Sequence, residues 1–459
     1  MSFNGLSEIA SLVTSFIMSF NGRMELRFIG PFLSWKNRNN YYAAGVRKGS
    51  NYWSNLIKFE NMPIPAITKL FKEFFESERT GGLILVGCTL VSILLTNSGA
   101  GPAYLHFWHA RLDLSFGAVP LDYSVEHWVN DGFMAIFFLL VGLEIEREIY
   151  IGELADFKKA LLPIFAAVGG MLVPAATHFL FNHGTPEQPG LGIPMATDIA
   201  FALGVLSLLG NKVPVSVKIF LTALAIIDDL GAILVIAIFY TKTLSLAWLA
   251  VALGIFLLLL VLNKLKVNNL VFYLLPGILM WYCMLRSGIH ATLSGVLLAF
   301  TIPFGRNSGG VSHANPSGKL QHWLHKPVAF FILPVFALAN TGIVLSAGWP
   351  HSLLEKNSLG ILAGLVIGKP VGILLCCWLA IRSKLCKLPE NMNWRHLAGL
   401  GLLAGIGFTM SIFITNLAFV DATHIQYSKI AILASSLLAG LLGYLFLAFA
   451  ATSKASALQ

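Results

Sequence analysis

The stretch IFLTALAIIDDLGAILVIAIFY, residues 219–240, is almost entirely apolar except for two adjacent carboxylates, Asp228 and Asp229. A helix of this length crosses a hydrocarbon layer of ~30 Å. Ionised side chains at membrane depth are costly, so they are rare and usually functional. The stretch therefore predicts a membrane-spanning helix with a charged site near its middle.

The composition of the whole chain agrees with a membrane protein. Of its 459 residues, 56% are hydrophobic and 12% are charged, whereas soluble domains have ~25% charged residues. The apolar residues form blocks of spanning length, and helices satisfy their own backbone hydrogen bonds in lipid. We predict an all-α polytopic membrane protein with twelve transmembrane helices, centred near residues 89, 136, 170, 203, 229, 253, 278, 295, 336, 370, 408 and 439.

The net charge of +9 is explained by the orientation of these spans. Twelve spans place 25 of the 31 Lys and Arg residues on the side of the N-terminus and 5 on the other side, and leave Lys369 inside a span. Basic residues accumulate in cytoplasmic loops. We therefore expect both termini in the cytoplasm, and we expect lipid rather than nucleic acid as the partner.

The ends and loops predict little chemistry. Residues 1–61 are rich in Asn and aromatic residues, and we expect a poorly ordered cytoplasmic extension of unassigned role before a twelve-helix domain at 62–455. The external segment 112–124, LDLSFGAVPLDYS, alternates apolar and polar residues and predicts a small β-hairpin, a contact for a homodimer, with a plain loop as the alternative. The cysteines have neither metal-site nor disulfide spacing: Cys88, Cys283, Cys376, Cys377 and Cys386.

Two spans are unusual. MATDIAFALGVLSLLG (195–210) is short and follows Pro194, and LLAGIGFTMSIFITNLAF (402–419) has Gly and hydroxyl residues in its middle. Both predict helices that unwind partway, and each lies between one preceding and one following span. Three-span units in inverted topology, each with an interrupted helix, are typical of secondary transporters with a site at the midplane.

Four ionisable residues lie near mid-span: Asp198, Asp228, Asp229 and Lys369. A structural Asp–Lys pair would explain at most two of them. Adjacent helical residues point about 100° apart, so one of the paired aspartates should line the ion path. The other should turn toward Lys369 or toward the crossing of the broken helices. Asp198, beside Thr197, can offset the positive N-terminal ends of two half-helices.

These groups suit exchange of a cation for protons. Carboxylates, freed carbonyls and a hydroxyl make an all-oxygen site for a hard cation. Burial favours the neutral form of a carboxyl group, and a bound cation opposes this. The site should be either protonated or loaded with a cation when it re-orients across the membrane.

Six motifs together resemble the NhaA family of bacterial Na⁺/H⁺ antiporters. They are WVNDGFMAIFFLLVGLE (128–144), ATDIAFALG (196–204), ALAIIDDLGAI (223–233), SGIHATLSGV (287–296), GKPVGI (368–373) and GIGFTMSIFI (405–414). The resemblance implies crossed broken helices 4 and 11 in the bacterial inner membrane. It implies electrogenic export of Na⁺ or Li⁺, driven by more entering protons and activated at alkaline pH. It implies no cofactor beyond the transported ions.

The resemblance also implies roles within the site. Asp229 would be the main ligand for Na⁺ or Li⁺, and Asp228 a second ligand or the partner of Lys369. Asp198 and Thr197 would support the site, and Lys369 matches a membrane lysine of the family.

Cytoplasmic pH sensing is a further implication. LEIERE places Glu144, Arg147 and Glu148 on one helix face, although an ordinary interfacial salt-bridge patch has the same spacing. His290 and His322 are further candidates on the resemblance.

Two departures from the family pattern leave the activation pH open. Gln321 stands where the family has a Glu before His322, and Glu146 stands where a basic residue is common.

Two other functions fit parts of the pattern. An intramembrane aspartyl protease would use Asp198 with Asp228 or Asp229, but the Gly-x-Gly-Asp signature is absent and Lys369 would have no role. A sodium-coupled organic-anion symporter of related fold should have more Gln, Asn and Glu in its broken helices. A membrane scaffold explains none of the deep charges.

Overall fold

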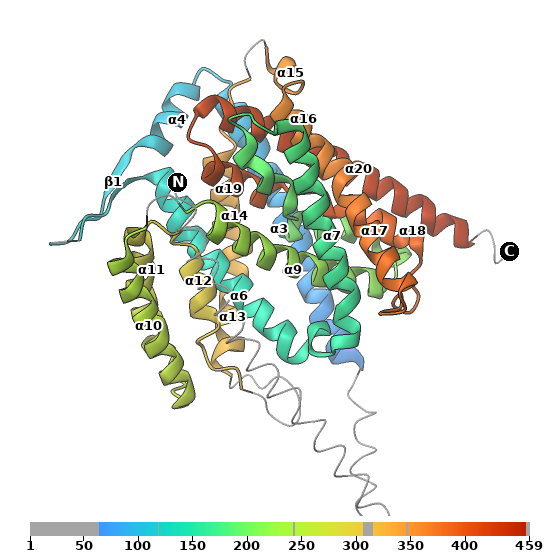
Figure 1. Cartoon of the computed structure of the whole chain (residues 1–459), viewed down its shortest axis with the longest axis horizontal. Helices are drawn as coiled ribbons and strands as arrows, with labels where there is room; N and C mark the ends of the chain where they lie inside the picture. Colours follow the sequence, from blue (N-terminus) through green and yellow to red (C-terminus); the bar gives the residue numbers. More distant parts are fainter. Residues whose placement is uncertain (1–63, 118, 242–243, 306–314, 346–347, 456–459) are drawn as a thin grey trace, which may run out of the picture. The chain divides into compact units, whose positions relative to one another are not determined.

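The computed structural model describes residues 64–117, 119–241, 244–305, 315–345 and 348–455, and most of these are helical (Figure 1). The expected extension, residues 1–61, lies outside the described residues. Each of the π-helical elements η2, η6 and η7 lies within a longer helix that continues after it.

The first part of the chain contains α3 (Ile64–Thr96), α4 (Gly101–His109), β1 (Arg111–Asp113), β2 (Asp122–Ser124), α5 (Val125–His127), η2 (Trp128–Phe133), α6 (Met134–Ile151), η3 (Glu153–Ala155), α7 (Phe157–Asn182), η4 (Gln188–Met195), α8 (Ile199–Leu208), η5 (Gly210–Lys212) and α9 (Val215–Phe239). The second part contains α10 (Leu246–Lys264), α11 (Val271–Ser287), α12 (Leu293–Ala299), α13 (Pro316–Pro327), η6 (Val328–Ile332), α14 (Leu333–Asn340), α15 (Trp349–Ser352), α16 (Lys356–Ala363), η7 (Gly364–Gly368), α17 (Lys369–Arg382), α18 (Trp394–Ala404), α19 (Phe408–Ala418) and α20 (Ala422–Ala455).

The helices have the length and composition of membrane spans. Within the residues that the structure describes, eight helices are long and apolar enough to cross a bilayer, or up to ten if each of two bent helix pairs is one span. The chain is therefore an all-α polytopic membrane protein, as predicted. The count of twelve stays a prediction, because α11 is a shorter apolar helix and α12 has 7 residues.

Two helices are interrupted near the middle of the protein. After η4, Ala196 and Asp198 are extended before α8 begins. Helices α18 and α19 are bent by 45° at a short break that includes Gly405 and Gly407. The Asp198 N–H donates to the Ile406 carbonyl at 2.7 Å, so the two breaks are joined directly.

The spans pack in two groups. We call α7–α9 with η4, and α16–α20 with η7, the core bundle; we call η2, α6, α10–α14 and η6 the support bundle. Contacts between the bundles include α6 with α9 and α14 with α19. The core bundle contains both interrupted helices.

Glycines allow the closest approach within the core bundle. A Cβ on Gly169 of α7 would lie 2.1 Å from the Gly372 carbonyl oxygen of α17, and a Cβ on Gly372 would lie equally close to Gly169. The two backbones therefore touch. At the next residue, Gly170, a Cβ would lie 3.1 Å from the Ile373 Cγ1 and 3.7 Å from the Lys369 Cε, so α7 passes directly beside the lysine side chain.

Strands β1 and β2 pair antiparallel, with Leu112 opposite Tyr123. Phe116, beyond β1, is 86% exposed. We call the end of the bundles that carries these strands the hairpin end. There α14 ends and contacts η2, which follows β2 closely in the chain.

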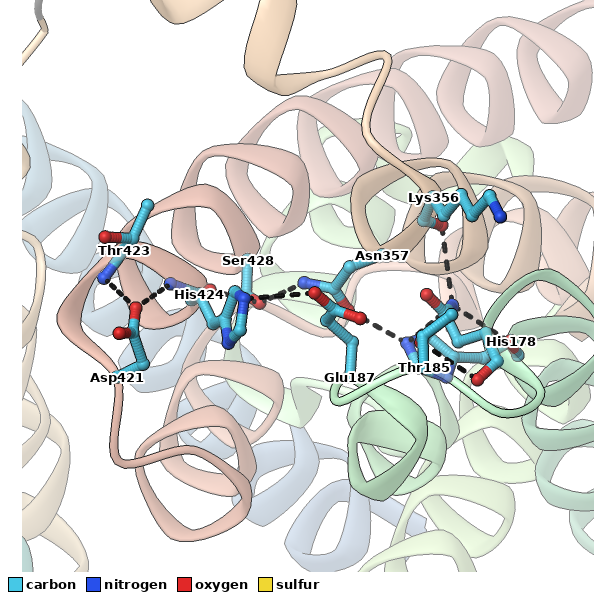
Figure 2. A network of polar contacts seen from close by, with 10 residues as sticks. His178, Thr185, Glu187, Lys356, Asn357, Asp421, Thr423, His424 and Ser428 are labelled. Carbon is cyan, nitrogen blue, oxygen red and sulfur yellow. Dashed lines mark hydrogen bonds and ion pairs between the residues drawn. The ribbon is translucent and has the colours of Figure 1, made fainter.

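A polar network joins four elements of the core bundle (Figure 2). His178 of α7 lies 3.0 Å from Asn357 Oδ1 of α16, and Asn357 Nδ2 donates to Ser428 Oγ of α20 at 2.7 Å. His424 of α20 pairs with Glu187, which precedes η4, at 3.0 Å. These contacts connect α7, α16 and α20 with the segment that leads into η4.

Candidate ion-binding site

Lys369 pairs with Asp228 inside the core bundle. Its Nζ lies 2.9 Å from Asp228 Oδ2 and donates to the Met195 carbonyl at 2.5 Å. Lys369 and Asp228 are both 0% exposed. Because Met195 ends η4, the lysine connects α17 to α9 and to the end of one broken helix.

Thr197 is the second neighbour of Asp228. Its Oγ1 lies 2.7 Å from Asp228 Oδ2 and 3.0 Å from the Ala404 carbonyl oxygen. Ala404 ends α18, so this one hydroxyl contacts α9 and both breaks. Asp228 Oδ2 is thus fully occupied by an ammonium group and a hydroxyl.

Asp198 caps two half-helices. Its Oδ1 accepts from the Phe201 N–H at 3.0 Å, and its Oδ2 accepts from the N–H and Oγ1 of Thr409 at 3.0 and 2.7 Å. These donors belong to the first turns of α8 and α19, where the helix dipoles present partial positive charge. The carboxylate is therefore compensated by two helix ends without a basic side chain.

Asp229 points into a cavity instead. The cavity, of about 60 Å³, is lined by Asp229, Asp198, Thr197, Glu144 and His325 together with apolar side chains of α6, η6 and α19, and it has room for several water molecules. Among the described residues, neither Asp229 Oδ1 nor Asp228 Oδ1 has a hydrogen-bond partner. Two buried carboxylate oxygens on adjacent residues are thus available to a cation.

The expected pH-sensing residues lie in different places. Glu144 faces the cavity that contains Asp229. Arg147 pairs with the adjacent Glu148 at 3.0 Å, and Glu148 also accepts the Glu153 N–H beyond the end of α6. His322 is exposed on α13, and His290 lies 3.0 Å from the Tyr240 carbonyl oxygen, between α11 and α12.

The two departures noted in the sequence also have distinct surroundings. Glu146 is buried and accepts a hydrogen bond from Ser317 Oγ at 2.9 Å, in the first turn of α13. Gln321 lies two turns before the cavity residue Val328 and is partly buried.

Sequence reasoning missed several groups at the site. His325 lines the cavity, and its spacing of three residues from His322 was the available signal. Backbone carbonyls of Met195, Ala404 and Ile406 carry no side-chain signal at all. The cysteines are free thiols, and within the described ranges no three His, Cys, Asp or Glu side chains are grouped to hold a resident metal.

Comparison with known proteins identifies the family. The family model described as Na⁺/H⁺ antiporter 1 matches residues 72–447. The Na⁺/H⁺ antiporter NhaA of Flavobacterium psychrophilum is 59% identical over 383 residues, which are 83% of this chain and 97% of that protein. The NhaA proteins of Dechloromonas aromatica and Citrobacter koseri are 58% and 48% identical over 385 and 383 residues, again 83% of this chain and 96% and 98% of theirs. The chain therefore belongs to the NhaA family and is a Na⁺/H⁺ antiporter of the membrane, as its motifs predicted.

Proposed function

We propose that Asp229, with Asp228, binds Na⁺ or Li⁺ in competition with protons, and that the exchange is electrogenic. The observation that carries this proposal is the pair of unpartnered buried oxygens on adjacent residues, Asp228 Oδ1 and Asp229 Oδ1, with Asp229 lining the cavity. Hard cations prefer carboxylate and carbonyl oxygens. The surrounding groups also present oxygen atoms: the Thr197 hydroxyl and the backbone carbonyls at the two breaks.

Charge compensation supports Asp229 as the exchanging group. Two helix ends compensate Asp198, and Lys369 compensates Asp228, whereas Asp229 has no basic partner among the described residues. An isolated charge in a low dielectric is costly. Asp229 therefore needs either a proton or a cation whenever the site is closed to water, which makes the two ions alternatives.

A second exchanged proton comes from the Asp228–Lys369 pair. A cation that engages Asp228 Oδ1 as well as Asp229 competes with the ammonium group for the same carboxylate. Lys369 would then lose its proton, and Asp229 would lose its own to the same cation. The net charge of the three side chains with the bound ion changes from 0 to −1. Exchange of two protons for one sodium ion moves net charge, so the membrane potential as well as the pH gradient would drive sodium export.

The sidedness follows from the basic residues. If α11 and α12 are counted in addition to the ten candidate spans, the chain crosses the membrane twelve times. Both termini and most Lys and Arg residues are then cytoplasmic. The hairpin end is then external. The cavity lining from Glu144, His325 and Val328 comes from the parts of α6, α13 and η6 away from that end, so this conformation opens to the cytoplasm of a bacterial inner-membrane protein.

The cavity also suits control by internal pH. Glu144 and His325 line the same space as Asp229, and Arg147, Glu148 and His322 lie on the same two helices, α6 and α13. Charges on these groups act on a cation entering through the cavity. We infer that transport is activated at alkaline pH.

The hairpin supports a homodimer. Leu112, Leu114 and Phe116 are 44%, 51% and 86% exposed, and a two-stranded sheet offers an unpaired edge to a second copy. Such a contact would lie outside the membrane and away from the ion site.

Proton-loaded inside-out vesicles test the transport proposal. Addition of Na⁺ or Li⁺ should dissipate the proton gradient, and Asp229→Asn should abolish the response while Asp113→Asn, an exposed hairpin carboxylate, should not. Electrogenicity is tested by imposing a potassium diffusion potential with valinomycin, which should change the rate. Full exchange by Asp229→Asn, or no response of the wild type to Na⁺ between about pH 6.5 and 9, would refute the assignment.

A further inference from the structure

Three asparagine side chains form a hydrogen-bonded cluster that the ion site does not use. Asn340 ends α14, Asn130 lies in η2 and Asn416 lies in α19. Asn340 Nδ2 donates to Asn130 Oδ1 at 2.8 Å, and Asn340 Oδ1 accepts from Asn416 Nδ2 at 2.6 Å and from Asn130 Nδ2 at 3.3 Å. Asn340 is 0% exposed. Both ends of its amide are therefore occupied inside the protein.

The cluster lies between the ion site and the hairpin end. Thr409, which contacts Asp198, precedes Asn416 by seven residues on α19, or roughly 10 Å along a helix with a rise of ~1.5 Å per residue. Asn340 is the last residue of α14, and Asn130 follows the second strand closely in the chain. The cavity that contains Asp229 extends the other way, toward Glu144 and His325.

An apolar layer separates the cluster from the ion site. Phe413 of α19 lies 5.5 Å from Phe138 of α6 and 6.5 Å from Phe336 of α14, measured between ring centroids. Each of the three rings is at most 2% exposed. A hydrated cation would lose its water on entering such a layer. This loss is costly because the aromatic rings supply no oxygen ligand to replace the water.

The asparagine cluster and the aromatic layer both join the two bundles. Phe413 and Asn416 belong to the core bundle. Phe138, Phe336 and Asn340 belong to the support bundle. The Asn416–Asn340 hydrogen bond therefore crosses between the bundles on the closed side of the site. Any movement of one bundle against the other that opens a path to the hairpin end must break this bond and part the rings.

Amides are suited to such a contact. The side-chain amide of Asn is neutral and does not titrate, so the contact adds neither a charge nor a proton-binding group to the path. Hydrogen bonds between amides can be exchanged for hydrogen bonds to water at a modest net cost. The contact can therefore close the path firmly and still open during each transport cycle.

We propose that Asn130, Asn340 and Asn416 form the latch that keeps the hairpin-end path closed in this conformation, above the barrier of Phe138, Phe336 and Phe413. Asn416 makes the bond that breaks, and Asn130 positions Asn340 to accept it. These are positioning residues, since none of them touches the ion site. The inference rests on the proposed alternating access of that site.

The test is the apparent sodium affinity measured separately from each side, in proteoliposomes of defined orientation. Asn416→Leu removes the bond between the bundles and preserves Asn130–Asn340. The apparent affinity for Na⁺ from one side equals the intrinsic affinity multiplied by the fraction of the protein that is open to that side. Loss of the latch should raise the fraction that is open to the hairpin end. The half-saturating Na⁺ concentration at the hairpin end should therefore fall about three- to tenfold, the effect of one neutral hydrogen bond, with a smaller change at the cavity end.

A matched control distinguishes the latch from general destabilisation. Asn357→Leu removes a buried amide whose partners, His178 and Ser428, lie in the core bundle (Figure 2). This variant should lower the unfolding temperature without changing the ratio of the two half-saturating concentrations. Asn416→Gln, which keeps an amide donor toward Asn340, should restore the ratio toward the wild-type value.

The outcomes separate the latch from the transport proposal. A wild type that exchanges Na⁺ for protons, with an unchanged ratio in Asn416→Leu, overturns the latch. If Asn416→Leu does not fold, Asn416→Ala provides the same comparison with a smaller side chain. A wild type without sodium-dependent exchange overturns the transport proposal instead.

Discussion

Lys369 pairs with Asp228, at 2.9 Å, while the adjacent Asp229 faces the cavity. One turn of α9 thus carries two carboxylates with different surroundings. The lysine also reaches the Met195 carbonyl, so its loss would affect both a buried charge and the end of a broken helix.

Replacement of Lys369 should therefore cost stability that a second substitution recovers. Lys369→Met leaves Asp228 buried and unpaired, and breaking a buried ion pair costs about 3–5 kcal/mol. Lys369→Met with Asp228→Asn removes both charges and should unfold at a higher temperature than the single variant. Thermal unfolding in detergent measures both, with Lys384→Met as the surface control. Equal unfolding temperatures of the single and double variants would contradict the pairing.

Sodium should stabilise the protein through Asp229. A ligand that binds only the folded state raises the free energy of unfolding by about 2.7 kcal/mol at 100 times its dissociation constant. We expect Na⁺ to raise the unfolding temperature of the wild type at alkaline pH, and to raise it less at acidic pH because protons occupy the same oxygens. Asp229→Asn should not respond, with choline chloride as the salt control. A sodium response preserved in Asp229→Asn would place the cation elsewhere.

The contact between α7 and α17 should not tolerate a methyl group. In Gly169→Ala the new Cβ meets the Gly372 carbonyl at 2.1 Å, so the two helices must separate. Overpacking of this kind costs about 1–3 kcal/mol, and the displaced α17 carries Lys369 with it. Gly87→Ala on α3 is the matched control, since its Cβ would have no atom within 4 Å. The unfolding temperature should fall for Gly169→Ala alone.

Asp421, at the hairpin end, should make a pH-dependent contribution to the stability of the protein against unfolding. Backbone hydrogen bonds from His424 and Thr423 at the start of α20 lower the pKa of Asp421. A carboxyl whose pKa is lower in the folded state stabilises the protein above its unfolded value, about 3.9, and loses this contribution as the pH falls through the folded value. Asp421→Ala should thus unfold at a lower temperature than the wild type at neutral pH. The difference should shrink under acidic conditions, and a difference independent of pH would argue against the charged cap.

The candidate site residues could be chosen from the sequence because charges are rare at membrane depth. Asp198, Asp228, Asp229 and Lys369 stood out against apolar surroundings, and the family membership and antiport function predicted from the motifs are confirmed. The helical polytopic fold followed from the length of the apolar blocks. The twelve-span count stays a prediction, because helix length and composition alone support up to ten.

The pairing within the site was beyond sequence reasoning. Which aspartate meets Lys369 depends on the rotation of α9 against α17, and tertiary packing sets that rotation. Sequence also cannot show that the Met195 carbonyl meets the lysine. His325 reaches the cavity because of the face that α13 presents to α6, which its own pattern does not reveal.

The hydrogen bond between the Asp198 N–H and the Ile406 carbonyl has a kinetic consequence. It links the backbones of the two breaks, so we expect the two broken helices to move together during transport. We expect each transported ion to require one such joint movement. Turnover should saturate with sodium and depend on bilayer thickness and fluidity, and electrical recordings should show a small steady current in place of unitary channel openings.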